Sequence, residues 1–255
     1  MSPCPVDYDR YAEGYGRRYE LESFDGLTAA LLAMTTGAAR ILEVGCGTGH
    51  WLRALAGQGA VVVGLDPSRA MMRQVHRPSS PLLTLGRAER LPFATKAFDR
   101  VLAIYALHHF SSRPAFFGEA HRALTPGGRI ATVGLDPLQG RDRWWIYEYF
   151  PEADALDRSR CPSSAAIREE LAVAGFGRLE TRTVQNIRAE TDATTAQRTG
   201  LLERSFTSQL AALSDRAYRE GCERVWSAAE DAASRGTQLM LTTDLRLYMT
   251  TGVKG

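Results

Sequence analysis

The chain has 255 residues, which is enough for one full α/β domain with a modest addition and a sizeable core. Its hydrophobic fraction of 44% is ordinary for a globular protein. The formal net charge is only +2, from 31 basic and 29 acidic side chains, so composition argues against the large basic face that nucleic-acid binding needs. No apolar run approaches the ~20 residues of a membrane-spanning helix, and the first residues lack the apolar stretch of a signal peptide.

The four cysteines stand far apart in the sequence, at Cys4, Cys46, Cys161 and Cys222. No pair has the CxxC spacing of a zinc or redox site, so we expect no metal site. Reduced thiols are expected instead, which predicts a cytoplasmic protein.

From residue 40 onward, short apolar runs alternate with stretches of helical spacing. The runs predicted to be strands are 40–44, 60–66, 81–86, 98–107 and 128–135. The stretches predicted to be helices are 50–56, 67–76 and 115–124. This alternation predicts a doubly wound parallel sheet with helices on both faces, in which ligands bind beyond the carboxyl ends of the strands.

The rest of the chain is less regular. Residues 163–176 have the pattern of an amphipathic helix that ends at Gly175, and residues 178–187 alternate like a half-exposed strand. Residues 189–236 are predicted to be mainly helical, and 238–252 to form one final strand or two. The N-terminal segment carries a predicted helix with four tyrosines, Tyr8, Tyr11, Tyr15 and Tyr19.

A glycine-rich turn follows the first predicted strand. Gly45, Gly47 and Gly49 let the chain adopt positive φ and let a ligand approach the backbone, and a helix follows at once, so amide groups point at that ligand. Glu43 precedes the turn. Asp66 ends the second strand and can accept hydrogen bonds from ribose hydroxyls. The spacing is GxGxG rather than the GxGxxG of dinucleotide sites, which argues against a nicotinamide cofactor.

These segments resemble the class I S-adenosylmethionine-dependent methyltransferases, specifically the ubiquinone/menaquinone-type, methyltransferase type 11-like group. The resemblance covers about residues 8–135 and rests on motifs in the family's order and spacing, namely ILEVGCGTG, VVVGLDPSRAMM, AERLPF, FDRV, ALHHF and EAHRALTPGGR. It implies a Rossmann-like, doubly wound, seven-stranded sheet whose last strand is antiparallel. It also implies S-adenosyl-L-methionine as cofactor and S-adenosyl-L-homocysteine as product.

The resemblance also implies roles for individual residues. The glycines would lie under the methionine and ribose, Asp66 would hold the ribose hydroxyls, and Pro67 and Met71 would pack on the adenine. The complete set implied to contact the cofactor is Tyr15, Glu43, Gly45, Gly47, Gly49, Asp66, Pro67, Met71, Ala88, Glu89 and Tyr105. For Tyr15, the alternative is that the N-terminal aromatic side chains only pack on the sheet edge.

One position departs from the family pattern. Arg87 stands where the family usually has Asp or Asn, which accepts a hydrogen bond from the adenine amino group. Arginine can only donate. Adenine recognition would then depend on backbone groups or on Glu89. Weaker cofactor binding is one expected consequence, and a changed cofactor is a less favoured alternative.

Two histidines follow the fourth predicted strand, on the rim where a methyl acceptor would bind. His108 or His109 could deprotonate a hydroxyl or amine near neutral pH. We favour His109, because it also recurs in the family. The alternative is that the pair shapes the loop or caps the next helix.

Aromatic residues are concentrated after the fifth predicted strand. Trp144, Trp145 and Tyr149 are candidates for the wall of an acceptor site, because aromatic side chains suit an apolar or planar molecule. The alternative is a small separate core under residues 189–236. In the first interpretation, residues 189–236 form a lid over the acceptor.

We therefore predict an N-terminal helical lid over residues 1–36 and a methyltransferase domain over 37–255, with the helical insert at about 189–236. The predicted function is in-line methyl transfer to a small, partly apolar acceptor, with no nucleic-acid partner and no membrane span. One alternative is a methyltransferase-like protein that binds cofactor without turnover, and a weaker one is an NAD(P)-dependent oxidoreductase. The sequence does not indicate an oligomeric state.

Overall fold

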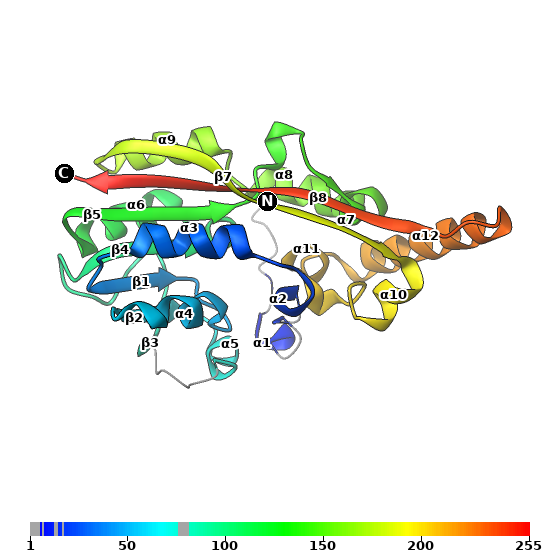
Figure 1. Cartoon of the computed structure of the whole chain (residues 1–255), viewed down its shortest axis with the longest axis horizontal. Helices are drawn as coiled ribbons and strands as arrows, with labels where there is room; N and C mark the ends of the chain where they lie inside the picture. Colours follow the sequence, from blue (N-terminus) through cyan, green and yellow to red (C-terminus); the bar gives the residue numbers. More distant parts are fainter. Residues whose placement is uncertain (1–5, 7, 13–14, 17, 76–81) are drawn as a thin grey trace.

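The computed structural model describes residues 6, 8–12, 15–16, 18–75 and 82–255. Its centre is an eight-stranded sheet with the order β3-β2-β1-β4-β5-β8-β6, in which β7 also pairs with β8 (Figure 1). The strands are β1 (Arg40–Val44), β2 (Val61–Asp66), β3 (Leu82–Leu85), β4 (Phe98–Ile104), β5 (Leu124–Gly134), β6 (Arg143–Trp144), β7 (Phe176–Asp192) and β8 (Met240–Lys254). The first five strands are parallel, and β8 is antiparallel to both β5 and β7.

The predicted fold class is confirmed, including the antiparallel last strand. The expected number of seven strands is exceeded by β6, a two-residue strand that pairs with β8. The segment 238–252 forms one strand and not two. The fifth strand begins at Leu124 rather than at 128, because Leu124 pairs with Phe98 ahead of a bulge.

Helices cover both faces of the sheet, as the strand–helix alternation predicted. One face packs against α3 (Asp25–Thr35) and α4 (His50–Leu55), through side chains such as Leu31 and Leu52. The other face packs against α6 (Arg113–Ala123) and α9 (Ser164–Val173), through side chains such as Phe116 and Leu171. Strand residues alternate between the two cores, as when Leu102 faces the first and Val101 the second.

Local signals in the sequence explain where several helices begin. The hydroxyl of Ser68 caps α5 (Arg69–Arg73) by accepting a hydrogen bond from the Met71 amide. Ser112 and Ser163 cap α6 and α9 in the same way. The predicted end of α9 is confirmed, because Gly175 follows it in the left-handed conformation, with φ of +94°.

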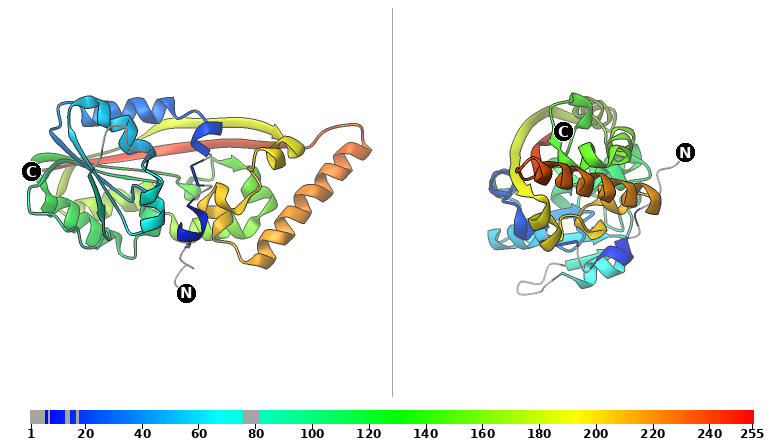
Figure 2. Two further views of the ribbon diagram at one scale, coloured as in Figure 1. Left: turned by 90° about the horizontal axis from the view of Figure 1, so that it is seen from below. Right: turned by 90° about the vertical axis from the view of Figure 1, so that its right-hand side faces the viewer.

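Strands β7 and β8 run past the body of the sheet and form a two-stranded arm (Figures 1 and 2). Their pairing continues from Phe176 with Lys254 to Asp192 with Met240, so β7 extends beyond the predicted end at 187. The arm carries a helical extension made of α7 (Trp145–Tyr149), α8 (Pro151–Arg160), α10 (Ala193–Arg198), the short helix η4 (Arg204–Phe206), α11 (Ser208–Ala211) and α12 (Asp215–Ser234). Residues 189–192 therefore belong to a strand, and the helical insert begins after them.

The N-terminal segment lies between the body of the sheet and the helical extension (Figures 1 and 2). It forms two short helices, α1 (Tyr8–Tyr11) and α2 (Arg18–Leu21), with a turn at residues 15–16. The expectation of one helix carrying all four tyrosines is therefore wrong. The bend lets Tyr8 and Tyr19 reach different partners, His109 and His50. Among the residues described, no helix combines the length and the apolar character needed to cross a membrane.

Candidate functional site

The loop after β1 has the geometry that its three glycines predict. Gly45, Gly47 and Gly49 all have left-handed backbones, with φ of +78°, +51° and +74°. A Cβ added to Gly45 would lie 2.6 Å from the Cβ of Ala106, and one added to Gly49 would lie 2.9 Å from Val75. A Cβ added to Gly47 would meet no described atom within 4 Å. Gly45 and Gly49 therefore satisfy packing, whereas Gly47 faces open space that a ligand can enter.

Asp66 holds this loop in place from the end of β2. Its Oδ2 accepts a hydrogen bond from the Gly47 amide and its Oδ1 accepts one from the Ser68 amide, both at 2.8 Å. The Gly45 amide donates to the Leu65 carbonyl at 2.7 Å. A carboxylate offers about four acceptor positions, so Asp66 can order the loop and also take hydroxyl donors from a ligand.

Glu43 is almost completely buried under the same loop, at 1% exposure. Its Oε2 has no hydrogen-bond partner among the residues described. Burial raises the pKa of this carboxyl well above its usual range, and the nearby Asp66 carboxylate raises it further. A buried acceptor of this kind suits a ligand that brings hydrogen-bond donors or positive charge to the loop.

Cys46 fills the inside of the turn. Its sulfur packs closely against Gly64 of β2, where an added Cβ would lie 2.8 Å from it. Burial raises the pKa of the Cys46 thiol, and Glu43 and Asp66 add to the effect, so the thiol stays protonated. A protonated, buried thiol is a poor nucleophile, which agrees with a structural role.

The residues expected around an adenine divide into two groups. Met71 and Ala88 are buried, whereas Pro67 and Arg87 are exposed. Glu89 faces the next loop, where its Oε1 accepts hydrogen bonds from the Ser111 amide at 2.6 Å and the Ser111 hydroxyl at 2.7 Å. Partial burial acts to raise the pKa of Glu89, but these hydrogen bonds outweigh it and lower the pKa. That oxygen therefore anchors the loop before α6.

Tyr105 stands directly after β4 in a strained backbone conformation. Its φ is +54°, which is uncommon for a residue other than glycine. Its amide donates to the Val133 carbonyl at 2.8 Å, which fixes it beside β5. Its side chain lines the cavity that opens at this edge of the sheet.

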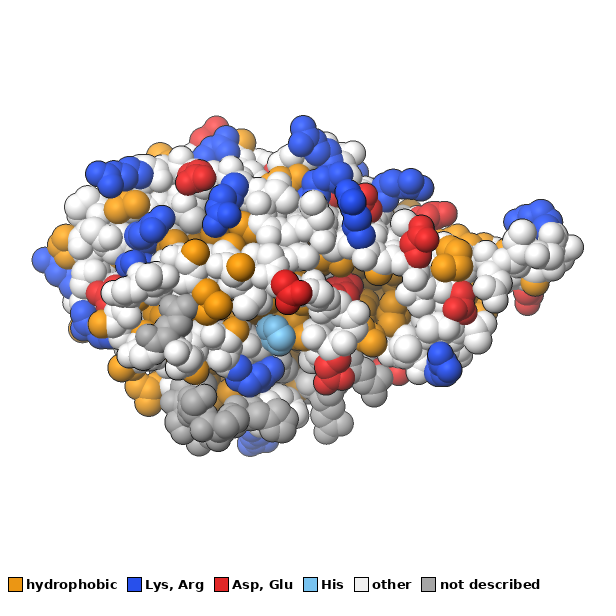
Figure 3. All heavy atoms as spheres, viewed as in Figure 1, with side chains coloured by type: hydrophobic (Ala, Val, Ile, Leu, Met, Phe, Trp, Pro, Cys, Tyr) orange, Lys and Arg blue, Asp and Glu red, His pale blue; other side chains and the backbone are white. Residues whose placement is uncertain are grey.

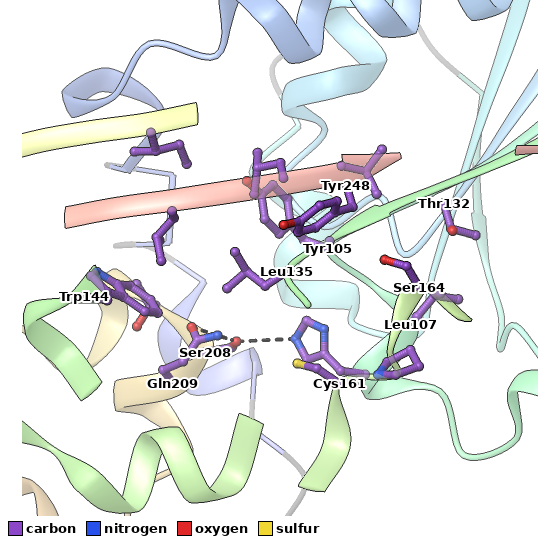
Figure 4. Close-up of a pocket in the computed structure, with 18 of the residues that line it drawn as sticks. Tyr105, Leu107, Thr132, Leu135, Trp144, Cys161, Ser164, Ser208, Gln209 and Tyr248 are labelled. Carbon is purple, nitrogen blue, oxygen red and sulfur yellow. Dashed lines mark hydrogen bonds between the residues drawn. The ribbon is translucent and has the colours of Figure 1, made fainter. Parts of the chain in front are cut away.

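The cavity lies beyond the carboxyl ends of β4 and β5, and the arm and the helical extension close it (Figure 4). Most of its wall is apolar, with contributions from Leu107, Leu135, Ile167 and Leu247. Polar groups enter the wall at separate points, from Thr132, Tyr248, Ser164, Ser208 and Gln209. The Oγ1 of Thr132 is buried without a hydrogen-bond partner in the described part of the chain. An apolar wall with a few polar groups is typical of a small-molecule site.

The two adjacent histidines have different surroundings. His108 lines the cavity, and its Nε2 lies 3.5 Å from the hydroxyl oxygen of Ser208. His109 is exposed, and its Nε2 lies 2.5 Å from the hydroxyl oxygen of Tyr8 in the N-terminal segment. The structure therefore brings His108, and not His109, to the cavity wall.

The three aromatic candidates for the acceptor wall are also separated. Trp144 lines the cavity, with its ring edge-to-face against Tyr147. Trp145 is 2% exposed and packs against Phe150 in the core. Tyr149 is half-buried outside the cavity lining, and its carbonyl accepts a hydrogen bond from Arg224 of α12. Of the three residues, only Trp144 lies where it can contact a molecule in the cavity, and Trp145 belongs to the main hydrophobic core rather than to a small separate one.

The N-terminal segment reaches the edge of the sheet where the strands end at several points. Tyr15 lines the cavity. Tyr19 stacks on His50, the first residue of α4, with ring centroids 3.8 Å apart. Helix α1 contacts α5, which follows β2. The segment thus runs along the carboxyl ends of the parallel strands, from the loop after β2 to the loop after β4.

Several cavity residues were not found by sequence analysis. Ser208 and Gln209 come from the helical insert, Tyr248 from β8 and Ser164 from α9. These are common residue types without a motif, and they meet only through tertiary folding. For Tyr8 there was a signal, the tyrosine-rich pattern, but its contact with His109 could not be deduced from spacing.

The outer surface carries both signs of charge. On the face shown in Figure 3, basic and acidic side chains are interspersed, and hydrophobic side chains are visible where the body meets the helical extension.

Comparison with known proteins gives consistent matches. The profile of a family described as a methyltransferase domain matches residues 42–132. Malonyl-[acyl-carrier protein] O-methyltransferase of Methylococcus capsulatus is 30% identical over 193 residues, which cover 71% of this chain and 68% of that protein. Demethylmenaquinone methyltransferase of Tropheryma whipplei is 32% identical over 133 residues, covering 48% of this chain and 55% of that protein.

Among solved structures, one described as a methyltransferase from an antibiotic biosynthesis pathway of Anabaena variabilis has the same fold. It superposes with a TM-score of 0.66 at 23% identity and covers 88% of this chain and 96% of its own. With several curated relatives the match is shorter, and it spans between 30% and 55% of their length.

Proposed function

This chain belongs to the class I S-adenosylmethionine-dependent methyltransferases, and we propose that it transfers a methyl group to a small, partly apolar acceptor bound beside Tyr105 and His108. The observation that carries the proposal is the contact between the glycine loop and the cavity wall. Gly45 packs on Ala106, the residue between Tyr105 and Leu107, which both line the cavity. A cofactor over the loop would therefore reach into the acceptor site.

The residues at the loop fit S-adenosyl-L-methionine. Gly47 leaves room above the backbone, Asp66 provides acceptors for ribose hydroxyls, and the buried Glu43 oxygen suits a ligand with positive charge. The cofactor supplies a methyl group that its sulfonium already activates. The residues proposed to hold it are Tyr15, Glu43, Gly45, Gly47, Gly49, Asp66, Pro67, Met71, Ala88, Glu89 and Tyr105.

The protein's main contribution to such a reaction is alignment of donor and acceptor, which can be worth about 7–11 kcal/mol. Trp144 and the apolar wall would hold the acceptor, and Trp145 and Tyr149 would support that wall from outside the cavity. An acceptor that must lose a proton needs a base. We assign this role to His108 rather than His109, because His108 lines the cavity and His109 is bound to Tyr8.

Two segments are proposed to act as a cover. The N-terminal residues before α3 span the cofactor edge, and the insert after β7 contributes Ser208 and Gln209 to the cavity. Helix α3 itself packs on the sheet and is not part of this cover. Exclusion of water would protect the activated methyl group during transfer.

The relatives' names support a small or carrier-bound acceptor, since they refer to malonyl-[acyl-carrier protein] and to demethylmenaquinone. The family gives no support to the NAD(P)-dependent oxidoreductase alternative. A cytoplasmic location and the lack of a nucleic-acid partner stay predictions.

A second candidate function is cofactor binding without turnover. Arg87 favours it, because this residue replaces an expected hydrogen-bond acceptor for the adenine.

Ligand binding tests the proposal. S-adenosyl-L-methionine and S-adenosyl-L-homocysteine should each raise the melting temperature, because a ligand at a hundred times its Kd stabilises a protein by about 2.7 kcal/mol. NADH and NADPH should not. The absence of a shift with either adenosyl compound would sink the proposal. Tight binding without transfer of labelled methyl to a broad acceptor panel would favour the second candidate.

A matched pair of variants makes the test specific. Asp66→Asn should abolish most of the thermal shift, because an amide cannot accept at both of its positions. Asp99 is a control, since it also accepts two backbone hydrogen bonds, from Ala39 and Arg40 at the start of β1, but both reach the single oxygen Oδ2. Asp99→Asn keeps an oxygen acceptor for them and should leave the ligand-induced shift unchanged.

A further inference from the structure

A buried ion pair lies behind the cavity wall. Asp157 and Arg160 of α8 have side chains that are 0% and 4% exposed. The Oδ1 of Asp157 accepts from Arg160 Nε at 2.9 Å and from Arg160 Nη2 at 2.8 Å. Burial of such a pair costs free energy unless the remaining positions are hydrogen-bonded. The hydrogen bonds to the remaining atoms of Asp157 and Arg160 therefore matter for the stability of this pair.

The other oxygen of Asp157 has two donors. Its Oδ2 accepts from the Tyr147 hydroxyl at 2.8 Å and from Gln209 Nε2 at 2.8 Å. Burial raises the pKa of Tyr147, and the Asp157 carboxylate raises it further, so this phenol remains a donor. Because Gln209 donates through Nε2, its Oε1 is identified as an acceptor.

Ser208 connects this network to the cavity. Its hydroxyl oxygen lies 3.2 Å from Arg160 Nη2, 3.3 Å from Gln209 Oε1 and 3.5 Å from His108 Nε2. Figure 4 shows Ser208 beside Gln209 at the cavity. Arginine can only donate, so Ser208 accepts from Arg160. The amide oxygen of Gln209 can only accept, so Ser208 gives it its single hydrogen.

These two assignments decide whether Ser208 or His108 is the donor in the contact between them. A hydroxyl has one hydrogen and two lone pairs. The hydrogen goes to Gln209 and one lone pair to Arg160, so the other lone pair accepts from His108. His108 must therefore carry a proton on Nε2. The opposite direction would leave the buried Gln209 oxygen without this donor.

We propose that Ser208 is a positioning residue that holds His108 in the tautomer with Nε2 protonated, so that Nδ1 is the nitrogen that accepts the substrate's proton. This inference rests on the proposed function of His108 as the base. It also assigns a role to the insert, whose helix α11 carries Ser208 and Gln209 to the cavity.

In this arrangement the proton released by the acceptor goes to His108. As the acceptor's oxygen or nitrogen forms its bond to the methyl carbon, the sulfur–methyl bond breaks and its electron pair stays on sulfur. The acceptor's proton moves to His108 Nδ1, which gives a neutral methylated product and an imidazolium. The Nε2–H of that imidazolium still donates to Ser208, so this hydrogen bond is kept through the transfer.

The tautomer can be measured without any activity. In protein labelled with ¹⁵N-histidine, two-dimensional NMR of the neutral ring distinguishes a protonated Nε2 from a protonated Nδ1, and a His108→Gln sample identifies the His108 signals. We expect wild-type protein to show Nε2–H. Ser208→Ala should give a mixture of tautomers, and Ser208→Thr, which keeps the hydroxyl, should restore the wild-type pattern. Ser205→Ala, in the same insert, is the matched control and should change nothing.

Observation of Nδ1–H in wild-type protein would overturn the proposal, and so would an unchanged tautomer in Ser208→Ala.

In turnover assays, Ser208→Ala should lower kcat at least tenfold with little change in KM for S-adenosylmethionine, and Ser208→Thr should recover most of the lost kcat. The two proposals fail separately. A correct tautomer in a protein that transfers no methyl group would count against the function alone, whereas active enzyme with the wrong tautomer would count against the role of Ser208.

Discussion

At the scale of single residues, the glycines of the loop have different roles: Gly45 is required for packing, and Gly47 is proposed to contact the ligand. Gly45 and Gly47 both have positive φ, but only at Gly45 does an added Cβ meet protein, at 2.6 Å from Ala106. Gly59 is a matched control for backbone strain, because its φ is +74° and an added Cβ meets no described atom within 4 Å. The three positions therefore allow strain, crowding and ligand contact to be distinguished.

We predict that Gly47→Ala lowers affinity for S-adenosylmethionine by tenfold or more, since its methyl group enters the proposed ligand space. Its loss of stability should match that of Gly59→Ala, about 1–2 kcal/mol from left-handed strain. Gly45→Ala should lose about 1–3 kcal/mol more through crowding. Calorimetric titration and urea unfolding measure these effects. Equal cofactor affinity in Gly47→Ala and Gly59→Ala would contradict the placement of the ligand over Gly47.

Arg87 is the residue at which this chain departs from its family. Its side chain is exposed, and the nearby Glu89 uses one oxygen to bind Ser111. We predict that Arg87→Asp tightens binding of S-adenosylmethionine severalfold, because it adds the acceptor that the adenine amino group lacks. Arg90→Asp, at another exposed position of the same turn, makes the same charge change and should have little effect. Equal or weaker binding by Arg87→Asp in calorimetric titration would disprove this explanation.

At the scale of elements, the helical extension depends on close packing between α12 and the junction of α7 with α8, where Phe150 lies. Gly221 of α12 lies directly against the ring of Phe150, where an added Cβ would be 2.1 Å from the nearest ring atom. Arg224 Nε donates to the Tyr149 carbonyl at 2.7 Å and joins the same two elements. A small residue at 221 is therefore needed for the helix to reach its place.

We predict that Gly221→Ala destabilises the protein by about 1–3 kcal/mol, because the methyl group forces the two elements apart. Gly118 of α6 is the control, since it is also a helical glycine but an added Cβ meets no described atom within 4 Å. Gly118→Ala should stabilise the protein by about 0.5–1 kcal/mol. Chemical unfolding measures both changes. A neutral or stabilising Gly221→Ala would show that this contact is not closely packed.

At the scale of the whole molecule, the proposed cofactor lies between the sheet and two covering segments. The N-terminal segment contacts the rim through Tyr8 with His109 and Tyr19 with His50. Both contacts lie at the rim, and Tyr19 also packs edge-to-face on the buried Trp51. We expect the segment to open at lower cost than the strands of the sheet.

We predict that S-adenosylhomocysteine slows amide hydrogen exchange in residues 15–24 and 105–112, because the bound ligand would hold the segment against the rim. Residues 93–97, at the amino ends of the strands, are an internal control and should exchange at the same rate with and without ligand. Mass spectrometry after hydrogen–deuterium exchange gives both rates. Ligand binding that leaves residues 15–24 unprotected would rule out their role as a cover.

Local chemistry in the sequence was sufficient for the parallel part of the fold and for the cofactor loop. Short apolar runs predicted β1 to β5, and alternating glycines predicted a loop with positive φ. Each of these signals acts over a few residues, because it reflects backbone conformation or burial of a single element. The spacing of the glycines argued only against a dinucleotide, and S-adenosylmethionine was implied by the resemblance of the longer motifs to a known family.

Only the tertiary structure decided which residues line the cavity proposed for the acceptor. The long pairing of β7 with β8 creates the arm, and the arm brings Ser208 and Gln209 to His108, about a hundred positions away in the sequence. The same folding sends His109 to Tyr8 and buries Trp145 while leaving Trp144 in the cavity. Adjacent residues share every local signal, so sequence alone cannot separate them. The direction of each side chain depends on which distant element packs beside it, and that is a property of the complete fold.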